Sequence, residues 1–491
     1  MQIIYNIKNM KQVCDKNMSF QDCELAILRM QVDQAQEKMS RRIVESPETT
    51  KILKIVENFI KKRKLVCYGG IAINALLPAG DKIYNEDIDL PDYDFFSPNA
   101  VEDAKRLADE FYKQGFKEVE AKAAQHHNTF KVYVNFMGVA DITYLSPELF
   151  KNVKKSAVKK NGIYYTDPNF LKMGMYLELS RPSGDTDRWE KVLKRLTLIN
   201  KYYPIDDHHC KDISFQRKLE NPEHTKEIYD HVQDILIDEK VVFFGGDALA
   251  RYKSYMPSTY KHKVEAIPDF DVISNDPLHT AEVIEDKLSA LGYKVDIYKK
   301  EPVGEIVPEH YEVKLGKDTI VFIYKSIACH SYNLVNDNGK QIRVATIDTI
   351  LSFYFAFLYA DRPYYDNKRL LCMANLLFKV QEKNRLEQKG VLKRFSITCM
   401  GRQPSREDMR EEKTRMHELI KKGDPRYDEW FLNYTPGSAT NKTKTKTLSI
   451  TNTTKTKTAV KSVKVKKLKG KKSKTNKRTK RTKTKKRYNK K

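Results

Sequence analysis

The sequence has no apolar run long enough for a membrane helix, and its first residues lack the apolar core of a signal peptide. The most apolar later stretch, residues 349–360, is too short to span a bilayer and follows Asp348. These absences predict a protein that is neither secreted nor inserted in a membrane.

Cysteine is scarce, and its spacing fits no familiar site. The chain has seven cysteines, an odd number, and no Cys-x-x-Cys pair. This pattern argues against a disulfide framework and favours a reducing compartment. The run His208-His209-Cys210 is not followed by further ligands at a zinc-binding spacing, so we expect no structural zinc there.

Acidic residues are absent from residues 436–491, which contain 23 Lys and Arg. These side chains account for nearly all of the formal net charge of +25, so the rest of the chain is close to neutral. The Lys-, Thr- and Ser-rich tail is expected to be disordered and to bind nucleic acid through its charge. A nuclear-localisation signal or a solubilising end are the alternatives for this segment.

The body of the chain contains a dense group of motifs, which begins with YGGIAIN. Residues 65–68 predict a short strand, Gly69 and Gly70 a tight turn, and the residues from Ile71 the start of a helix. Because glycine lets an anion approach the backbone closely, and the first amides of a helix are unpaired, this junction suits a phosphate group.

Two aspartates follow at alternating positions in PDYDFFS. Asp92 and Asp94 would point to the same face of a strand, where their mutual repulsion calls for cations, typically a pair of divalent metals. Asp141, in the later strand-like run VADIT, would lie beside them. Acidic decoration of a surface strand is the alternative for Asp92 and Asp94 taken alone.

The blocks YGGIAIN, PDYDFFSPN, VADITY and LSRPSGDTDRWEKVLKRL occur in this order within residues 50–205. This arrangement resembles the polymerase β-like nucleotidyltransferases, and more narrowly the poly(A) polymerase catalytic subunits of poxviruses and other large cytoplasmic DNA viruses. The sequence has Ile71 where many members of the wider superfamily have Ser or Thr after the glycines.

The resemblance implies AMP transfer from ATP to the 3′ end of single-stranded RNA without a template. Asp92, Asp94 and Asp141 would be the catalytic residues and would hold two Mg²⁺ or Mn²⁺ ions, while Gly69 and Gly70 would cradle the triphosphate. The implied setting is the virion or a viral factory in the host cytoplasm. A homodimer or a separate processivity subunit are open alternatives.

Three basic residues of the last block add to the expected nucleotide site. Arg188, Lys191 and Arg195 would share one face of a helix and could bind a triphosphate or an RNA backbone. A solvated charged face, balanced by neighbouring acidic side chains, is the alternative.

The second half of the chain repeats the first in motif order. Gly245-Gly246 follows Gly69-Gly70 at an offset of 176, and the segment PDFDVIS follows PDYDFFS at 177. The later pairs Ser146 and Ser326, and Arg181 and Arg362, continue the drift to 180 and 181. We therefore expect two copies of one fold.

The second copy is expected to lack a third carboxylate. Aligning Ser146 with Ser326 places Val321 opposite Asp141, whereas the smaller offset would place Asp318 there. Because Asp318 belongs to an expected hairpin turn, we favour Val321 and a copy without catalytic function. Asp269 and Asp271 would then be relics or a weak metal site.

The expected fold class is α+β, with two tandem nucleotidyltransferase domains in which a mixed sheet is flanked by helices. The predicted parts are an N-terminal helical segment, a catalytic domain, a degenerate second domain, a charged helical segment and the disordered tail, at residues 1–64, 65–205, 206–385, 386–435 and 436–491. Competing functions are nucleotidyl transfer to another substrate, oligoadenylate synthesis, and a non-catalytic RNA-binding subunit.

Overall fold

The computed structural model describes residues 13–15, 17–85, 89–205, 210, 213–215, 225–264, 269–337, 339–437 and 463–464. His208 and His209 of the discounted zinc site lie outside these residues, as does nearly all of the basic tail.

The first half of the chain forms a mixed sheet whose strands run in the order β16-β3-β4-β5-β2-β1-β7-β6. The strands are β1 (Val66–Cys67), β2 (Tyr93–Ser97), β3 (Val119–Ala123), β4 (Thr129–Val134), β5 (Met137–Tyr144), β6 (Val158–Lys160), β7 (Ile163–Tyr165) and β16 (Asn433–Tyr434). Buried side chains alternate along β4, as expected for a strand with one face on the core.

Helices cover this sheet, and local sequence signals set where several of them begin. They are α3 (Pro47–Arg63), α4 (Gly69–Leu76), α5 (Ala100–Lys113), α6 (Pro147–Ser156), α7 (Pro168–Leu179) and α8 (Trp189–Tyr202). The side chain of Ser46 accepts a hydrogen bond from the Thr49 amide at the start of α3, and Pro47 is its first residue. In α5, Ala104, Leu107 and Phe111 are buried on one face.

The second half repeats the strand order of the first. Its sheet runs β15-β13-β14-β8-β9-β12-β11-β10-β17, so the series β3-β4-β5-β2-β1-β7-β6 recurs as β10-β11-β12-β9-β8-β14-β13. The strands are β8 (Val242–Phe243), β9 (Phe270–Ser274), β10 (Val295–Lys300), β11 (His310–Leu315), β12 (Asp318–Lys325), β13 (His330–Asp337), β14 (Lys340–Ala345), β15 (Cys399–Met400) and β17 (Val463–Lys464). The predicted duplication and the α+β fold class with mixed sheets are confirmed.

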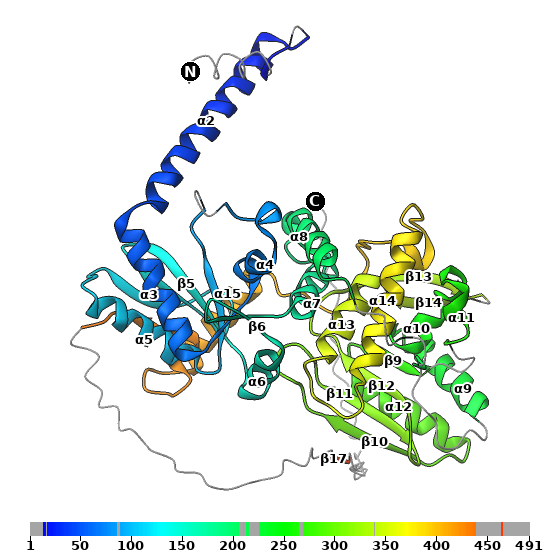
Figure 1. The fold of residues 1–491 in the computed structure, drawn as a ribbon. Coiled ribbons are helices and arrows are strands. Elements are labelled where there is room, and N and C mark those ends of the chain that lie inside the picture. Colours follow the sequence, from blue (N-terminus) through cyan, green and yellow to red (C-terminus); the bar gives the residue numbers. More distant parts are fainter. Residues whose placement is uncertain are drawn as a thin grey trace, which may run out of the picture.

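The longer helices of the second half lie beside this sheet (Figure 1). They are α9 (Thr225–Asp238), α12 (Pro277–Ala290), α13 (Ile347–Phe357) and α14 (Asn367–Lys383), and the short helices are α10 (Gly246–Ala250) and α11 (Ser258–Lys261).

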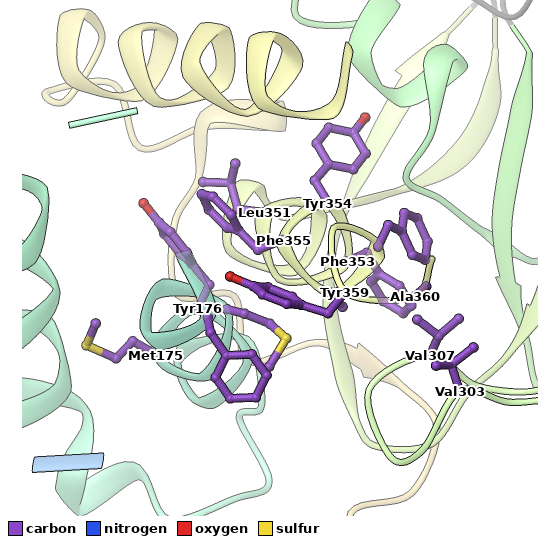
Figure 2. Close-up of a cluster of buried hydrophobic side chains, with 14 of the residues drawn as sticks. Met175, Tyr176, Val303, Val307, Leu351, Phe353, Tyr354, Phe355, Tyr359 and Ala360 are labelled. Atoms are coloured by element: carbon purple, nitrogen blue, oxygen red, sulfur yellow. The ribbon is translucent and has the colours of Figure 1, made fainter. Parts of the chain in front are cut away.

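The two halves share a core in which α7 packs against α13. Figure 2 shows Tyr176 of α7 beside Phe355 of α13, and their rings stack with centroids 5.9 Å apart. At the other end of this interface, the Tyr359 hydroxyl donates to the carboxylate of Asp167, 2.7 Å away, at the start of α7. The two copies are therefore joined by buried aromatic packing.

The segment after α14 connects the two sheets, which sequence analysis did not foresee because it expected only surface helices there. β15 pairs with β13 in the second sheet, and β16 pairs with β3 at the edge of the first. Between them lie α15 (Arg406–Leu419) and α16 (Tyr427–Phe431). The edge of the first sheet is thus completed by residues more than 300 positions later in the chain.

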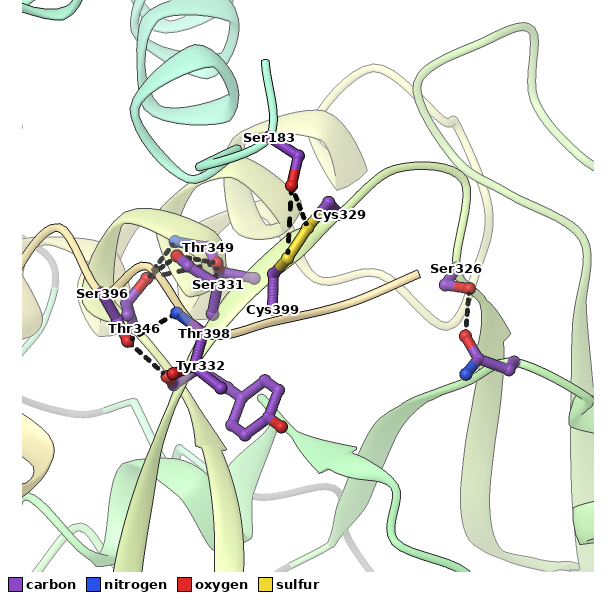
Figure 3. Close-up of a disulfide and its surroundings, with 11 residues drawn as sticks. Ser183, Ser326, Cys329, Ser331, Tyr332, Thr346, Thr349, Ser396, Thr398 and Cys399 are labelled. Atoms are coloured by element: carbon purple, nitrogen blue, oxygen red, sulfur yellow. Dashed lines mark hydrogen bonds between the residues drawn. A yellow bond between two sulfur atoms is a disulfide. The ribbon is translucent and has the colours of Figure 1, made fainter. Parts of the chain in front are cut away.

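The cysteines contradict the expectation of a chain without a disulfide framework. Disulfides join Cys14 to Cys23, Cys210 to Cys372, and Cys329 to Cys399. The last of these lies beside Ser183, as Figure 3 shows, and ties β15 to the residues before β13. The partners of the second and third pairs are 162 and 70 residues apart, so only the tertiary fold reveals them.

Ahead of α3, the long helix α2 (Phe20–Val44) projects away from the rest of the protein (Figure 1). None of its side chains is buried. In the part of the chain that the structure describes, no helix is long and apolar enough to cross a membrane.

Candidate active site

Two of the predicted aspartates meet across neighbouring strands at the middle of the first sheet. β2 and β5 are parallel, and Asp94 of β2 lies directly opposite Asp141 of β5. Asp92 comes immediately before β2, and its carbonyl accepts a hydrogen bond from the Asp94 amide. The structure thus places Asp141 beside the Asp-x-Asp motif, as the sequence indicated.

Lys131, which the sequence analysis missed, forms an ion pair with Asp141. It lies opposite Asp141 in the antiparallel pair β4–β5, and its Nζ is 2.5 Å from Asp141 Oδ2. The alternation of β4 could have identified it, because Lys131 points to the same sheet face as the aspartate it opposes.

The proximity of the three carboxylates is visible in their electrostatics. Burial, together with the charges of Asp92 and Asp141, raises the pKa of Asp94 from 3.8 to about 7. Burial and the charge of Asp141 also raise the pKa of Asp92. Ionised carboxylates in this arrangement are unfavourable unless a cation compensates them.

The carboxylates of Asp92, Asp94 and Asp141 are suitable ligands for divalent metals, although they do not converge on a common point. No three Asp, Glu, His or Cys side chains among the described residues converge as a metal cluster. Carboxylate oxygens are nevertheless the ligands that Mg²⁺ and Mn²⁺ prefer, and the Lys131 ammonium already compensates the charge of Asp141.

The Gly-Gly turn lies against the aspartates. α4 begins at Gly69 itself, two residues earlier than predicted, and Gly69 has φ +65°. A Cβ at Gly69 would come 2.8 Å from Asp94 Oδ2, and one at Gly70 would come 2.2 Å from the Tyr84 hydroxyl. Position 69 therefore requires glycine, a Cβ at Gly70 would displace Tyr84, and the amides at the start of α4 lie next to the carboxylates.

The three predicted basic residues do not lie on one face of a single helix. Arg188 ends a short 3₁₀ turn before α8, lies 3.2 Å from Glu178, and exerts its charge on Asp94. Arg195 donates to the Tyr84 hydroxyl at 2.9 Å, so it reaches towards the Gly70 turn. Lys191 is exposed on α8. Two of the three are thus connected to the site.

The corresponding place in the second copy has lost its third carboxylate. β9 and β12 are parallel, and Asp271 lies opposite Phe322. The prediction that Val321 occupies the place of Asp141 was wrong by one position, since Phe322 lies there. The reason is that the link from β12 to Ser326 is one residue shorter than the link from β5 to Ser146.

The glycine turn of the second copy is also altered. Asp247, the third residue from Gly245, is buried near the start of the five-residue helix α10, where Arg251 pairs with it. A Cβ at Gly245 would meet Asp271 Oδ2 at 2.3 Å. An acidic side chain at this helix start disfavours a triphosphate.

A cavity of about 720 Å³ opens next to the first site. Its walls come from the β3–β4 hairpin, from α7 and the loop that ends at Arg188, and from α15 and α16 of the late segment. Arg188, whose charge acts on Asp94, lines this cavity together with residues near position 430.

Comparisons with known proteins match the part of the chain that contains this site. Residues 54–185 match the family model described as "Poly(A) polymerase catalytic subunit". A candidate poly(A) polymerase catalytic subunit of African swine fever virus is 40% identical over 172 residues, which are 34% of this chain and 36% of that protein. The corresponding protein of Acanthamoeba polyphaga mimivirus is 29% identical over 262 residues, 51% of this chain and 43% of its own. The chain thus matches these curated relatives over less than half of their length.

A solved structure extends the likeness to the second copy. The crystal structure of the Megavirus polyadenylate synthase superposes with a TM-score of 0.72 at 22% identity, covering 86% of this chain and 87% of that one. The chain has the fold of a polyadenylate synthase, and its residues 54–185, which contain all three predicted aspartates, match the poly(A) polymerase catalytic subunits of large DNA viruses.

Proposed function

We propose that this protein adds AMP units from ATP to the 3′ end of single-stranded RNA without a template and releases pyrophosphate. The observation that carries the proposal is the placement of Asp94 and Asp141 opposite each other on parallel strands, with Asp92 just before the first strand and a Gly-Gly helix start beside them. This arrangement lies within the segment that matches the polymerase family.

Asp92, Asp94 and Asp141 would hold two Mg²⁺ or Mn²⁺ ions, which in such reactions lower the pKa of the attacking hydroxyl and neutralise charge on the leaving pyrophosphate. The raised pKa of Asp94 supports this role, because a carboxylate that is unfavourable when ionised alone gains most from a bound cation. Asp141 would face the RNA 3′-hydroxyl and help to remove its proton.

The phosphates would lie at the start of α4. Gly69 and Gly70 leave room for the anion, and the amides of the first helical turn would donate to it. Arg195, aligned by Tyr84, and Arg188 would add positive charge on the same side, whereas Lys191 would act only through its exposed charge.

The test is extension of a labelled single-stranded RNA with each of the four nucleotide triphosphates and Mg²⁺ or Mn²⁺. Long products with ATP alone are expected from the unmodified protein. Asp92→Ala and Asp94→Ala should abolish them, and Asp269→Ala, the matched change in the second copy, should leave them intact. No extension with any nucleotide by a folded protein would refute the proposal, and loss of activity in Asp269→Ala would assign catalysis to the second copy as well.

The basic residues 438–491 would keep RNA close to the site by charge alone. From the viruses that encode the relatives, we infer that the protein works in the virion or in the host cytoplasm. Whether a second copy or a processivity subunit assists it is an outcome of the extension assay, since a distributive product pattern would call for a partner.

A further inference from the structure

The cavity beside the active site has an aromatic wall. His127, in the β3–β4 hairpin, stacks on Trp430 of α16, with ring centroids 4.0 Å apart and an interplanar angle of 20°. Both residues line the cavity. Partial burial of the ring lowers the pKa of His127, so its ring is neutral near pH 7 and presents an uncharged stacking surface.

Trp430 is held in place by the catalytic sheet. The carbonyl of Leu432 accepts a hydrogen bond from the Ala123 amide, and β16 then pairs with β3. On the other side of α16, Asp428 accepts from Lys105 Nζ at 2.7 Å. A rigidly held indole pays little entropy when a flat ligand stacks on it.

The position of the aromatic pair relative to the aspartates indicates whether the pair faces the RNA or the nucleotide. The glycine turn follows β1, on one side of Asp94, whereas β4, β3 and β16 lie on the other side, beyond Asp141. With strands about 4.8 Å apart, β16 lies about 14 Å from β5. The last two nucleotides of an RNA strand whose 3′ end lies at Asp141 can cover this distance.

The polar lining suits a base more than a phosphate chain. The described lining carries as many acidic as basic side chains, so it lacks the excess positive charge that a phosphate backbone requires. The Nε of Arg181, another lining residue, is buried and has no hydrogen-bond partner among the described residues. A lining with balanced charge and an aromatic wall therefore suits the flat face of a nucleobase.

We infer that Trp430 and His127 form a stacking site for one of the last two bases of the RNA, on the Asp141 side of the catalytic centre. The inference rests on the proposed function and adds to it the residues that hold the RNA 3′ end. The adenine of ATP, which could also stack there, is the competing occupant.

The test measures binding of a fluorescent oligoadenylate to the full chain by anisotropy, without nucleotide or metal. The same RNA with an abasic last or next-to-last nucleotide is the second ligand. Loss of the stacked base should weaken binding to the unmodified protein roughly 5- to 100-fold. Trp430→Ala should bind the intact RNA as weakly as it binds the abasic one, and Trp430→Phe should retain most of the difference.

Two further variants separate stacking from misfolding. His127→Ala changes the other member of the pair from an exposed hairpin position and should weaken RNA binding in the same direction. Phe136→Ala removes an exposed aromatic ring at the opposite turn of β4 and should leave RNA binding unchanged.

The inference is overturned if the abasic and intact RNAs bind the unmodified protein equally, or if folded Trp430→Ala raises the KM for ATP while RNA affinity is unchanged. The second result would assign the site to the adenine of ATP. Because binding is measured without turnover, a protein that shows the stacking effect but extends no RNA would refute the proposed function alone.

Discussion

Replacing Asp94 by Asn should stabilise the metal-free protein, by an amount that grows between about pH 4 and pH 7. Moving the pKa of this carboxyl from 3.8 to about 7 corresponds to about 4 kcal/mol of unfavourable interaction in the ionised form. Because neighbouring side chains and water relax around the charge, we expect about half of this, roughly 2 kcal/mol, as the gain in unfolding free energy.

The direction of the pH dependence follows from proton linkage. Between about pH 4 and pH 7 the folded protein holds the Asp94 proton that the unfolded chain has released, so stability falls as pH rises through this window. Asp94→Asn removes that fall. The difference between variant and wild type should therefore be near zero at pH 4, grow up to pH 7 and stay constant above it.

Urea unfolding in EDTA at pH 4.5, 6 and 8 measures the effect. Asp187→Asn, which removes an exposed carboxylate near α8, is the matched control and should change stability little at any pH. Added Mg²⁺ should raise the midpoint of the wild type at pH 8 more than that of Asp94→Asn. A gain of equal size at all three pH values, or no gain at pH 8, would refute the electrostatic account of this site.

Three other predictions concern the turn, the domain contacts and the tail. Gly69→Ala should abolish RNA extension and lower stability by about 1–2 kcal/mol, because its φ is +65° and its Cβ would press on a carboxylate; Gly80→Ala, with open space around the Cβ, should do neither. Arg394→Ala should cost about 3 kcal/mol in urea unfolding, since it leaves the carboxylate of Asp348 buried without its partner, and a loss below 1 kcal/mol would contradict this. Deleting residues 438–491 should weaken RNA binding and flatten its salt dependence, and an unchanged salt slope would show that the tail does not contact RNA.

Local patterns predicted the central strands β5, β2 and β1 of the first sheet, which carry the candidate site. The Gly69-Gly70 turn located a helix start, and the alternation of Asp92 and Asp94 located the strand β2. These signals are reliable because they depend on residues within one turn or one strand of each other. The placement of Asp141 beside Asp94 needed one further step, a hairpin that returns the chain to the sheet.

Other features of the site depend on contacts between distant segments. Tyr84, in a loop without a recognisable motif, contacts both Arg195 and the Gly70 turn. The role of Lys131 is apparent only from the strand register, which places it opposite Asp141. Arg188, Lys191 and Arg195 do not share the predicted helix face, because Arg188 lies in a 3₁₀ turn that precedes the helix. A spacing argument assumes one continuous helix, and a break of one turn changes where each side chain points.

The sequence by itself determined the duplicated fold, the three aspartates and the glycine helix start. Each of these depends on short motifs that recur in the same order along the chain. The tertiary structure alone decided which residues close the site. Trp430 is brought to the first sheet by the edge strand β16 that follows it. Cys210 forms a disulfide with Cys372, which is 162 residues later in the chain. Sheet edges and disulfides join segments hundreds of residues apart, and their partners are selected by packing of the whole chain, which no local pattern encodes.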